Sequence, residues 1–213
     1  MNLRNSDAFT LAEVLITLGI IGVVAALTMP SLIQSHKKQE ATARLKKFNS
    51  MMQQAIIMSE MDNGEMSDWI YTEKSDTITG TMATKEFFMT YLAKYIKYTT
   101  VQESKTSDNR FYVYMPDGSY FSLYRGDCID FFFDINGDKA PNEEGRDIFR
   151  FLACPPSVTG LCNGKGGWCS YYSKSTKSSR EARLTNCKNK GMYCSGLLEY
   201  DNWEFKSDYP YRL

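Results

Sequence analysis

Four side chains in one polar stretch have the type and spacing of cation ligands. Asp134, Asn136 and Asp138 occupy every second position, the spacing that begins an EF-hand-like calcium loop, and Asp147 lies near enough along the chain to complete the site. The stretch departs from that loop because Lys139 holds the glycine position and the closing bidentate glutamate is missing. The alternative interpretation is an Asn-Gly turn followed by a solvated acidic loop. Calcium is thus one of two interpretations, and the sequence indicates no other cofactor.

The cysteines form a second set of reactive side chains. There are 6 of them, all between Cys128 and Cys194, and such an even, clustered set is typical of a disulfide framework in an oxidising compartment. The chain has no CxxC motif, which counts against a redox-active pair and a zinc knuckle. Many connectivities are allowed, and the sequence leaves the choice open. One arrangement is favoured: Cys162 with Cys169 and Cys187 with Cys194, each pair seven residues apart, and Cys128 with Cys154, which would tie adjacent strands.

The sequence contains few of the residue patterns that are typical of enzyme active sites. The single histidine, His36, lies at the edge of an apolar segment, which excludes an intact Ser-His-Asp or Cys-His site in the rest of the chain. There is neither a GxSxG motif nor a phosphate-binding loop. An acid pair such as Asp134 and Asp138 remains, but acids at this spacing are commoner on solvated loops. We therefore do not expect an enzyme.

A basic run near Tyr171 and Tyr172 offers a different chemistry, because single-stranded nucleic acid can stack on aromatic rings among cations. The basic residues are Lys165, Lys174, Lys177, Arg180 and Arg183. The commoner interpretation is a solvated loop. The whole chain has 25 basic and 25 acidic residues, so no overall field recruits a polyanion. Nucleic acid is therefore not an expected partner.

The element that must position these groups is a long N-terminal helix. No charged residue occurs between Glu13 and His36, and as a helix this segment spans about 30 Å, the thickness of the hydrocarbon core of a bilayer. Apolar residues then recur at three- and four-residue steps as far as Ser59, and Asn63-Gly64 ends the pattern. The sequence predicts one helix of about 80 Å, half in lipid and half packed on a domain.

The start of this helix resembles the N-terminus of type IV prepilins, a family that includes the pseudopilins of type II secretion systems. A polar leader ends at Ala8, where the family usually has glycine, and Phe9-Thr10-Leu11-Ala12-Glu13 and an apolar helix follow, with Pro30 at the family's spacing. The resemblance covers about the first 50 residues. It implies cleavage between Ala8 and Phe9 by a prepilin peptidase, and N-methylation of the new Phe9 amine.

Glu13 and Pro30 acquire assembly roles from this resemblance. A carboxylate inside a bilayer is costly unless it is paired or reaches the interface, and after cleavage Glu13 lies one helical turn from a free amine. Pairing with the amine of its own or a neighbouring subunit would set the axial register of a growing filament. The alternative is a glutamate that snorkels into the head groups. Pro30 removes one backbone hydrogen bond and allows the helix to bend.

The implied function is that of a structural subunit of a type IV pilus-like or type II secretion pseudopilus filament. Its partners would be other pilin or pseudopilin subunits, the prepilin peptidase and an inner-membrane assembly platform. The alternative is a membrane-anchored extracytoplasmic binding module, for DNA or a surface ligand, at a filament tip. The positive residues after the span, such as Lys37 and Lys38, favour a cytoplasmic C-terminal domain. The leader and the cysteines favour the opposite orientation, which we adopt: a single-pass protein of the bacterial cytoplasmic membrane, N-terminus inside, that later joins an extracytoplasmic filament.

The expected fold is α+β, with the long helix packed on a small antiparallel sheet of about three to four strands and a disulfide-stapled C-terminal loop region. The expected divisions are a leader at 1–8, a transmembrane and filament-core helix at 9–35, its amphipathic continuation at 36–63, and an extracytoplasmic globular pilin-like domain at 64–213. The strands expected from β propensity lie at 110–115, 120–124, 127–135 and 147–152, with a last edge strand in 203–213. Further helices are expected at 85–98, capped by Thr84, at 179–191 and at 194–200.

Overall fold

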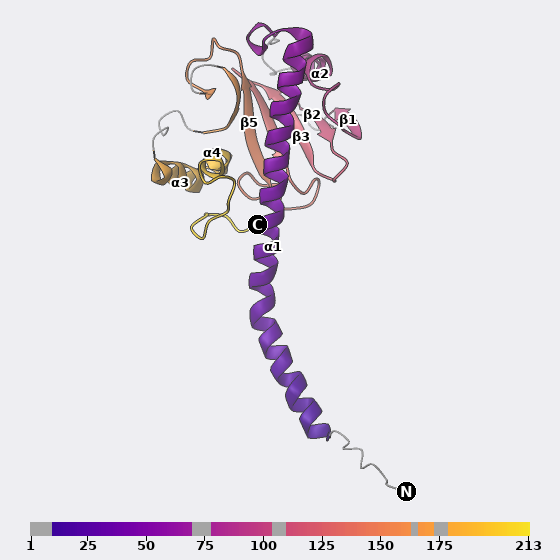
Figure 1. Cartoon of the computed structure of the whole chain (residues 1–213), viewed down its shortest axis with the longest axis vertical. Helices are drawn as coiled ribbons and strands as arrows, with labels where there is room; N and C mark the ends of the chain where they lie inside the picture. Colours follow the sequence, from indigo (N-terminus) through magenta and orange to yellow (C-terminus); the bar gives the residue numbers. More distant parts are fainter. Residues whose placement is uncertain (1–9, 70–77, 104–109, 163–165, 173–178) are drawn as a thin grey trace.

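The computed structural model describes residues 10–69, 78–103, 110–162, 166–172 and 179–213 (Figure 1). Its helices are α1 (Leu11–Asn63), α2 (Ile78–Tyr91), α3 (Arg180–Asn189) and α4 (Cys194–Tyr200), with 3-10 turns at Met66–Asp68 and Gly191–Tyr193. Its strands are β1 (Thr100–Glu103), β2 (Phe111–Tyr114), β3 (Tyr120–Arg125), β4 (Ile129–Asp134), β5 (Ile148–Cys154) and β6 (Gly167–Ser170). This is the expected α+β fold.

α1 is one helix of 53 residues, and it continues through Pro30. Its N-terminal half projects away from the domain (Figure 1) and contains an 18-residue window with a mean hydropathy of 2.3, none of which is buried. Burial begins at Ala41 and recurs at three- and four-residue steps to Ser59. Gly64 then ends the helix with a φ of 80°, a conformation that suits glycine. The long two-part helix predicted from the sequence is confirmed.

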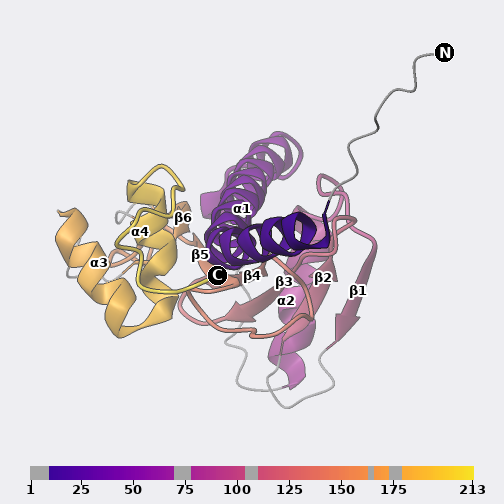
Figure 2. The ribbon, with the colours of Figure 1, turned by 90° about the horizontal axis from the view of Figure 1, so that it is seen from below.

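The sheet is a fully antiparallel meander of 6 strands in the order β1 to β6. The four central strands were expected, whereas β1 and β6 were not. Viewed from below, α1 lies over the sheet, and α3 and α4 lie together beyond its β6 end (Figure 2). The chain after α4 forms turns instead of the expected edge strand.

The second helix differs from its expected position. α2 begins before Thr84, which lies fully buried inside the helix instead of capping it. The helix ends at Tyr91, because the N–H groups of Leu92 and Ala93 both bond to the carbonyl of Phe88 and close a turn. The apolar residues beyond Tyr91 therefore reach the core from a turn.

The core forms where α1 crosses the sheet. The Phe48 ring stacks on Phe133 with centroids 4.0 Å apart and also contacts Phe121 and Phe151 at 5.4 and 5.2 Å. Phe88 of α2 contacts the same Phe121 ring at 5.9 Å. The rings of both helices therefore pack on the same face of the sheet, in offset and edge arrangements that favour aromatic pairs.

Three disulfides hold the later part of the chain together, and they join the three pairs that the sequence favoured. Cys128–Cys154 links the start of β4 to the end of β5, and Cys162–Cys169 links a loop to β6. Cys187–Cys194 joins α3 to α4 across 7 residues. These cross-links restrict the unfolded chain in a region with little regular structure.

We expect Phe48→Ala in the full chain in detergent micelles to lower the free energy of unfolding by about 3–5 kcal/mol, because it removes a fully packed aromatic side chain. Denaturant unfolding followed by near-ultraviolet circular dichroism measures this change. Met61→Ala is the control on the same helix, since its side chain is 83% exposed and should cost less than about 0.5 kcal/mol. Equal losses for the two variants would contradict this description of the core.

Candidate functional site

The first candidate site lies at the start of α1. The Glu13 Oε2 accepts hydrogen bonds from the N–H and the hydroxyl of Thr10, both at 2.8 Å, and the Glu13 N–H donates to the Thr10 hydroxyl at 3.3 Å. This reciprocal arrangement is a capping box, which satisfies donors that a helix start leaves unpaired. This cap was not predicted from the sequence, although Thr10-Leu11-Ala12-Glu13 has the Thr-x-x-Glu pattern typical of a capping box.

The capping box leaves part of the Glu13 carboxylate available. Oε2 accepts both hydrogen bonds from Thr10, while Oε1 makes no hydrogen bond within the residues that the structure describes. Ala8 and Phe9, the predicted processing residues, lie outside the described residues. The geometry therefore shows a cap at Glu13, and its pairing with an amine stays a prediction, as does an assembly role for Pro30.

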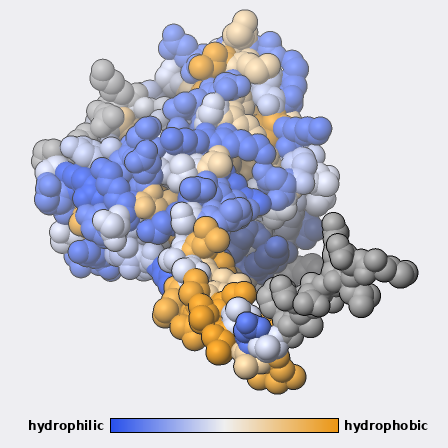
Figure 3. All heavy atoms as spheres, turned by 60° about the horizontal axis from the view of Figure 1, so that its bottom comes forward, coloured by the Kyte–Doolittle hydropathy of each residue, from blue (hydrophilic) through white to orange (hydrophobic). Residues whose placement is uncertain are grey.

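Beyond the cap, the helix surface has the character of a membrane segment. Of the described helices, α1 is long and apolar enough to cross a membrane. Its large apolar side chains from Leu11 to Ile33 are about half exposed or more. In Figure 3 this part is a continuous hydrophobic projection from a largely hydrophilic domain face. The core helix of a soluble domain would bury such side chains, so this surface fits insertion in lipid.

The second candidate site is the predicted calcium loop. The structure brings Asp134, Asn136 and Asp147 together, while Asp138 is exposed. Asp147 uses both carboxylate oxygens: Oδ2 accepts from the N–H of Asn142 at 2.9 Å and from the Asn136 amide at 3.2 Å, and Oδ1 accepts from the N–H of Glu143 at 2.7 Å. These bonds fix the path of the loop.

No group of three or more His, Cys, Asp or Glu side chains in the described ranges is arranged to hold a metal ion. The loop also has a close neighbour: a Cβ at Gly137, which has a φ of +72°, would lie 2.3 Å from the carbonyl oxygen of Gly118 in the β2–β3 turn. The described contacts therefore explain the Asn-Gly sequence as a tight turn against that hairpin. Calcium binding by these residues stays a prediction.

The structure describes only part of the basic run. Lys165, Lys174 and Lys177 lie outside the described residues. Arg180 is held between Asp201 and Asp208, with four nitrogen–oxygen distances of 2.7–2.8 Å.

The other members of the run are also engaged. Arg183 donates to the carbonyl of Gly196 at 2.7 Å and lies over the ring of Tyr172, which is buried. Tyr171 stacks on Tyr193 at 5.5 Å. The described arginines and tyrosines of the run therefore take part in the packing of α3 and α4.

Burial raises the pKa of Asp134 to about 7. The nearby Asp147 carboxylate raises this pKa further, whereas the hydrogen bond from the N–H of Asn136 lowers it. The folded protein therefore retains a proton that the unfolded chain, with an aspartate pKa of about 3.9, has released. Between about pH 4 and pH 7 this group makes the free energy of unfolding fall as the pH rises.

We expect Asp134→Asn to remove this dependence, so that the variant gains stability relative to the wild type between about pH 4 and pH 7. Denaturant unfolding at a series of pH values measures the difference between the two proteins. Asp138→Asn, a substitution at an exposed position of the same loop, is the control. Parallel profiles for the wild type and Asp134→Asn would refute the assignment.

Comparison with known protein families gives two matches. Residues 3–29 match the prokaryotic N-terminal methylation motif, which supports the type IV prepilin-like identity of the N-terminus and a membrane-anchored, pilin-type protein. No curated protein and no solved structure matches the chain. The second match extends over residues 31–213 and includes the entire described globular domain. Because it spans most of the sequence, the chain belongs to the family of unknown function DUF6613.

Proposed function

We propose that this protein is a structural subunit of a type IV pilus-like or type II secretion pseudopilus filament. The observation that carries the proposal is the combination of the methylation motif at residues 3–29 with an apolar helix whose side chains the domain leaves unburied. Such a helix needs lipid or the helices of other subunits around it, because water does not solvate its apolar surface. A filament core of like helices meets this requirement outside the membrane.

We propose that the subunit exists in two states, first anchored in the membrane and then assembled in a filament. In the first, a single pass through the bacterial cytoplasmic membrane anchors it, with the leader 1–8 inside and the domain 64–213 outside. Disulfides between all six cysteines support an external, oxidising location for that domain. In the second, the prepilin peptidase removes the leader, and an assembly platform transfers the subunit into a filament with other pilin or pseudopilin subunits.

Glu13 has two separable roles in this proposal: it caps α1, and it sets the register between subunits. Its Oε2 caps α1 through Thr10, while its negative charge would attract the Phe9 amine of a neighbouring subunit and fix the register between them. The capping role requires only a hydrogen-bond acceptor, which glutamine also supplies. The role in setting the register requires a negative charge, which glutamine lacks.

The first test is the mass and N-terminal sequence of the protein isolated from membranes, with and without the peptidase. We expect a chain that starts at N-methylated Phe9 when the peptidase is present, and the uncut chain when it is absent. Ala8→Leu should block the cut, because a large side chain replaces a small one at the cleavage position. A chain that keeps its leader in peptidase-competent cells would refute the proposal.

The second test compares Glu13→Gln with Glu13→Ala. If the charge sets the register, both variants fail to assemble although Glu13→Gln keeps the capping box. Filaments sheared from cells and quantified by immunoblot measure assembly, and N-terminal sequencing confirms that both variants are still cleaved. Filaments at the wild-type level in Glu13→Gln alone would show that Glu13 acts only as a cap.

A further inference from the structure

A cavity of about 440 Å³ lies where α1 leaves the globular domain. Its walls come from α1 between Lys37 and Arg44, the β2–β3 turn, the 135–147 loop and the final residues Arg212 and Leu213. We propose that this cavity binds the phosphate of an anionic phospholipid head group at the membrane surface. The inference depends on the membrane anchor, and it requires neither cleavage at Ala8 nor filament assembly.

The lining of the cavity is rich in positive charge. Its basic residues are Lys37, Arg44, Lys139, Arg146 and Arg212, against the acidic residues Glu40, Asp117 and Asp147. No carboxylate side chain in the described chain pairs with Lys139 or Arg212. Lys37, by contrast, already donates to the main-chain oxygen of Leu213 at 3.4 Å. Two cations, Lys139 and Arg212, therefore remain available to an anionic ligand.

The three carboxylates, by contrast, are already engaged. Glu40 accepts from Arg44 at 2.9 Å. Asp117 accepts from Lys47 at 2.6 Å; burial raises its pKa, but the Lys47 and Ser119 hydrogen bonds outweigh this and hold the pKa at about 2. Asp147 accepts from main-chain N–H groups with both oxygens. Their charges are therefore offset or tied to the backbone, and the free cations set the preference of the cavity.

The cavity also lies at the depth of lipid head groups. Lys37 directly follows His36, the first basic residue after the uncharged segment, and at about 1.5 Å per residue Arg44 is about 12 Å beyond that boundary. The head-group layer adds about 5–8 Å to each side of the hydrocarbon core. Figure 3 shows hydrophilic side chains over the domain face from which the apolar helix leaves. A head-group phosphate beside α1 thus lies level with the cavity.

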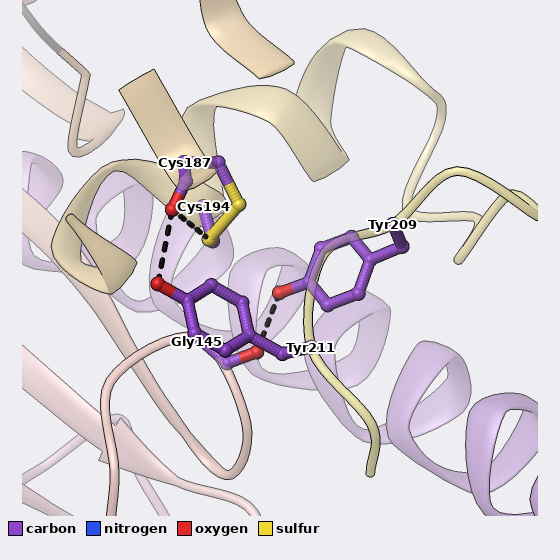
Figure 4. Close-up of a disulfide and its surroundings, with 5 residues drawn as sticks. All are labelled: Gly145, Cys187, Cys194, Tyr209 and Tyr211. Carbon is purple, nitrogen blue, oxygen red and sulfur yellow. Dashed lines mark hydrogen bonds between the residues drawn. A yellow bond between two sulfur atoms is a disulfide. The ribbon is translucent and has the colours of Figure 1, made fainter. Parts of the chain in front are cut away.

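Arg212 is held at the cavity by the fold. The Tyr211 hydroxyl donates to the carbonyl of Cys187 at 3.1 Å, and the Tyr209 hydroxyl donates to the carbonyl of Gly145 at 2.6 Å, so both rings clamp the tail beside the Cys187–Cys194 disulfide (Figure 4). Arg146 donates to the carbonyl of Arg212 at 3.1 Å.

Further along the tail, Gln34 donates to the oxygen of Leu213 at 2.6 Å. The end of the chain is therefore joined both to the domain and to the membrane-proximal part of α1. A guanidinium on a backbone fixed in this way loses less entropy when it binds a phosphate.

The chemistry selects among lipids. Lysine and arginine make strong, charge-assisted hydrogen bonds to phosphate oxygens, and the volume lies within the range of about 300–1,000 Å³ typical of small-ligand pockets. Phosphatidylglycerol presents a phosphate with a neutral glycerol. Phosphatidylcholine adds a cation that would lie among the basic side chains, so the cavity should discriminate against it.

The test uses the full chain in detergent micelles, mixed with equal amounts of phosphatidylglycerol and phosphatidylcholine with the same acyl chains. Native mass spectrometry counts the lipids that each protein retains. We expect the wild type to retain phosphatidylglycerol in about tenfold preference or more, and Lys139→Ala/Arg212→Ala to lose the preference, because each residue supplies a charge-assisted bond.

Lys46→Ala/Lys97→Ala is the matched control, since both lysines are exposed, lie outside the cavity lining and remove the same charge. It should keep the preference of the wild type. Equal retention of the two lipids by the wild type, or the same loss in the control, would overturn the proposal. Displacement of the lipid by millimolar inorganic phosphate would also overturn it, in favour of a soluble phosphate ligand. The uncleaved precursor can be used throughout, so the result is independent of the cleavage and assembly tests.

Discussion

The packing of the Phe48 face of α1 against the sheet is the interaction on which the rest of this structure depends. The same helix must be apolar all round in its N-terminal part and amphipathic from Ala41 onward. One continuous helix satisfies both conditions only if a face of its C-terminal half packs on the sheet while its N-terminal half stays clear of the domain. The rings of Phe133, Phe121 and Phe151 provide that anchor. Every site described above is positioned relative to this helix.

The C-terminal part of the chain depends on long-range contacts instead of regular structure. Arg180 joins the start of α3 to Asp201 and Asp208, which follow α4. A Cβ at Gly191 would lie 2.0 Å from the carbonyl oxygen of Glu144, so the bend between α3 and α4 packs directly on the 135–147 loop. With the Cys187–Cys194 disulfide, these contacts make the loop, the bend and the tail one unit. The loop and the tail of that unit line the cavity together.

The sequence predicted the features that local pattern controls. Periodicity identified α1 and its buried face, and β propensity identified β2 to β5. Cysteine spacing favoured two of the disulfide pairs, and the expected neighbouring strands favoured the third, Cys128–Cys154. β1 was missed because Thr100–Glu103 shows no clear alternation, and β6 because Gly167–Ser170 lies in a loop-like composition. The aromatic tail resembled a strand, yet Tyr209 and Tyr211 donate to carbonyls more than 20 residues away in sequence. Such partners, like the ion pairs of Arg180 and the cations around the cavity, depend on tertiary structure that no local pattern encodes.

The continuity of α1 has a mechanical consequence. From Leu11 to the first buried residue, Ala41, the helix forms an arm about 45 Å long that ends in a firmly attached domain. Transmembrane helices tilt on average by about 20° from the bilayer normal. Over this arm such a tilt moves the domain sideways by about 15 Å. In a membrane, a change of tilt driven by hydrophobic mismatch would therefore shift the domain sideways relative to neighbouring molecules.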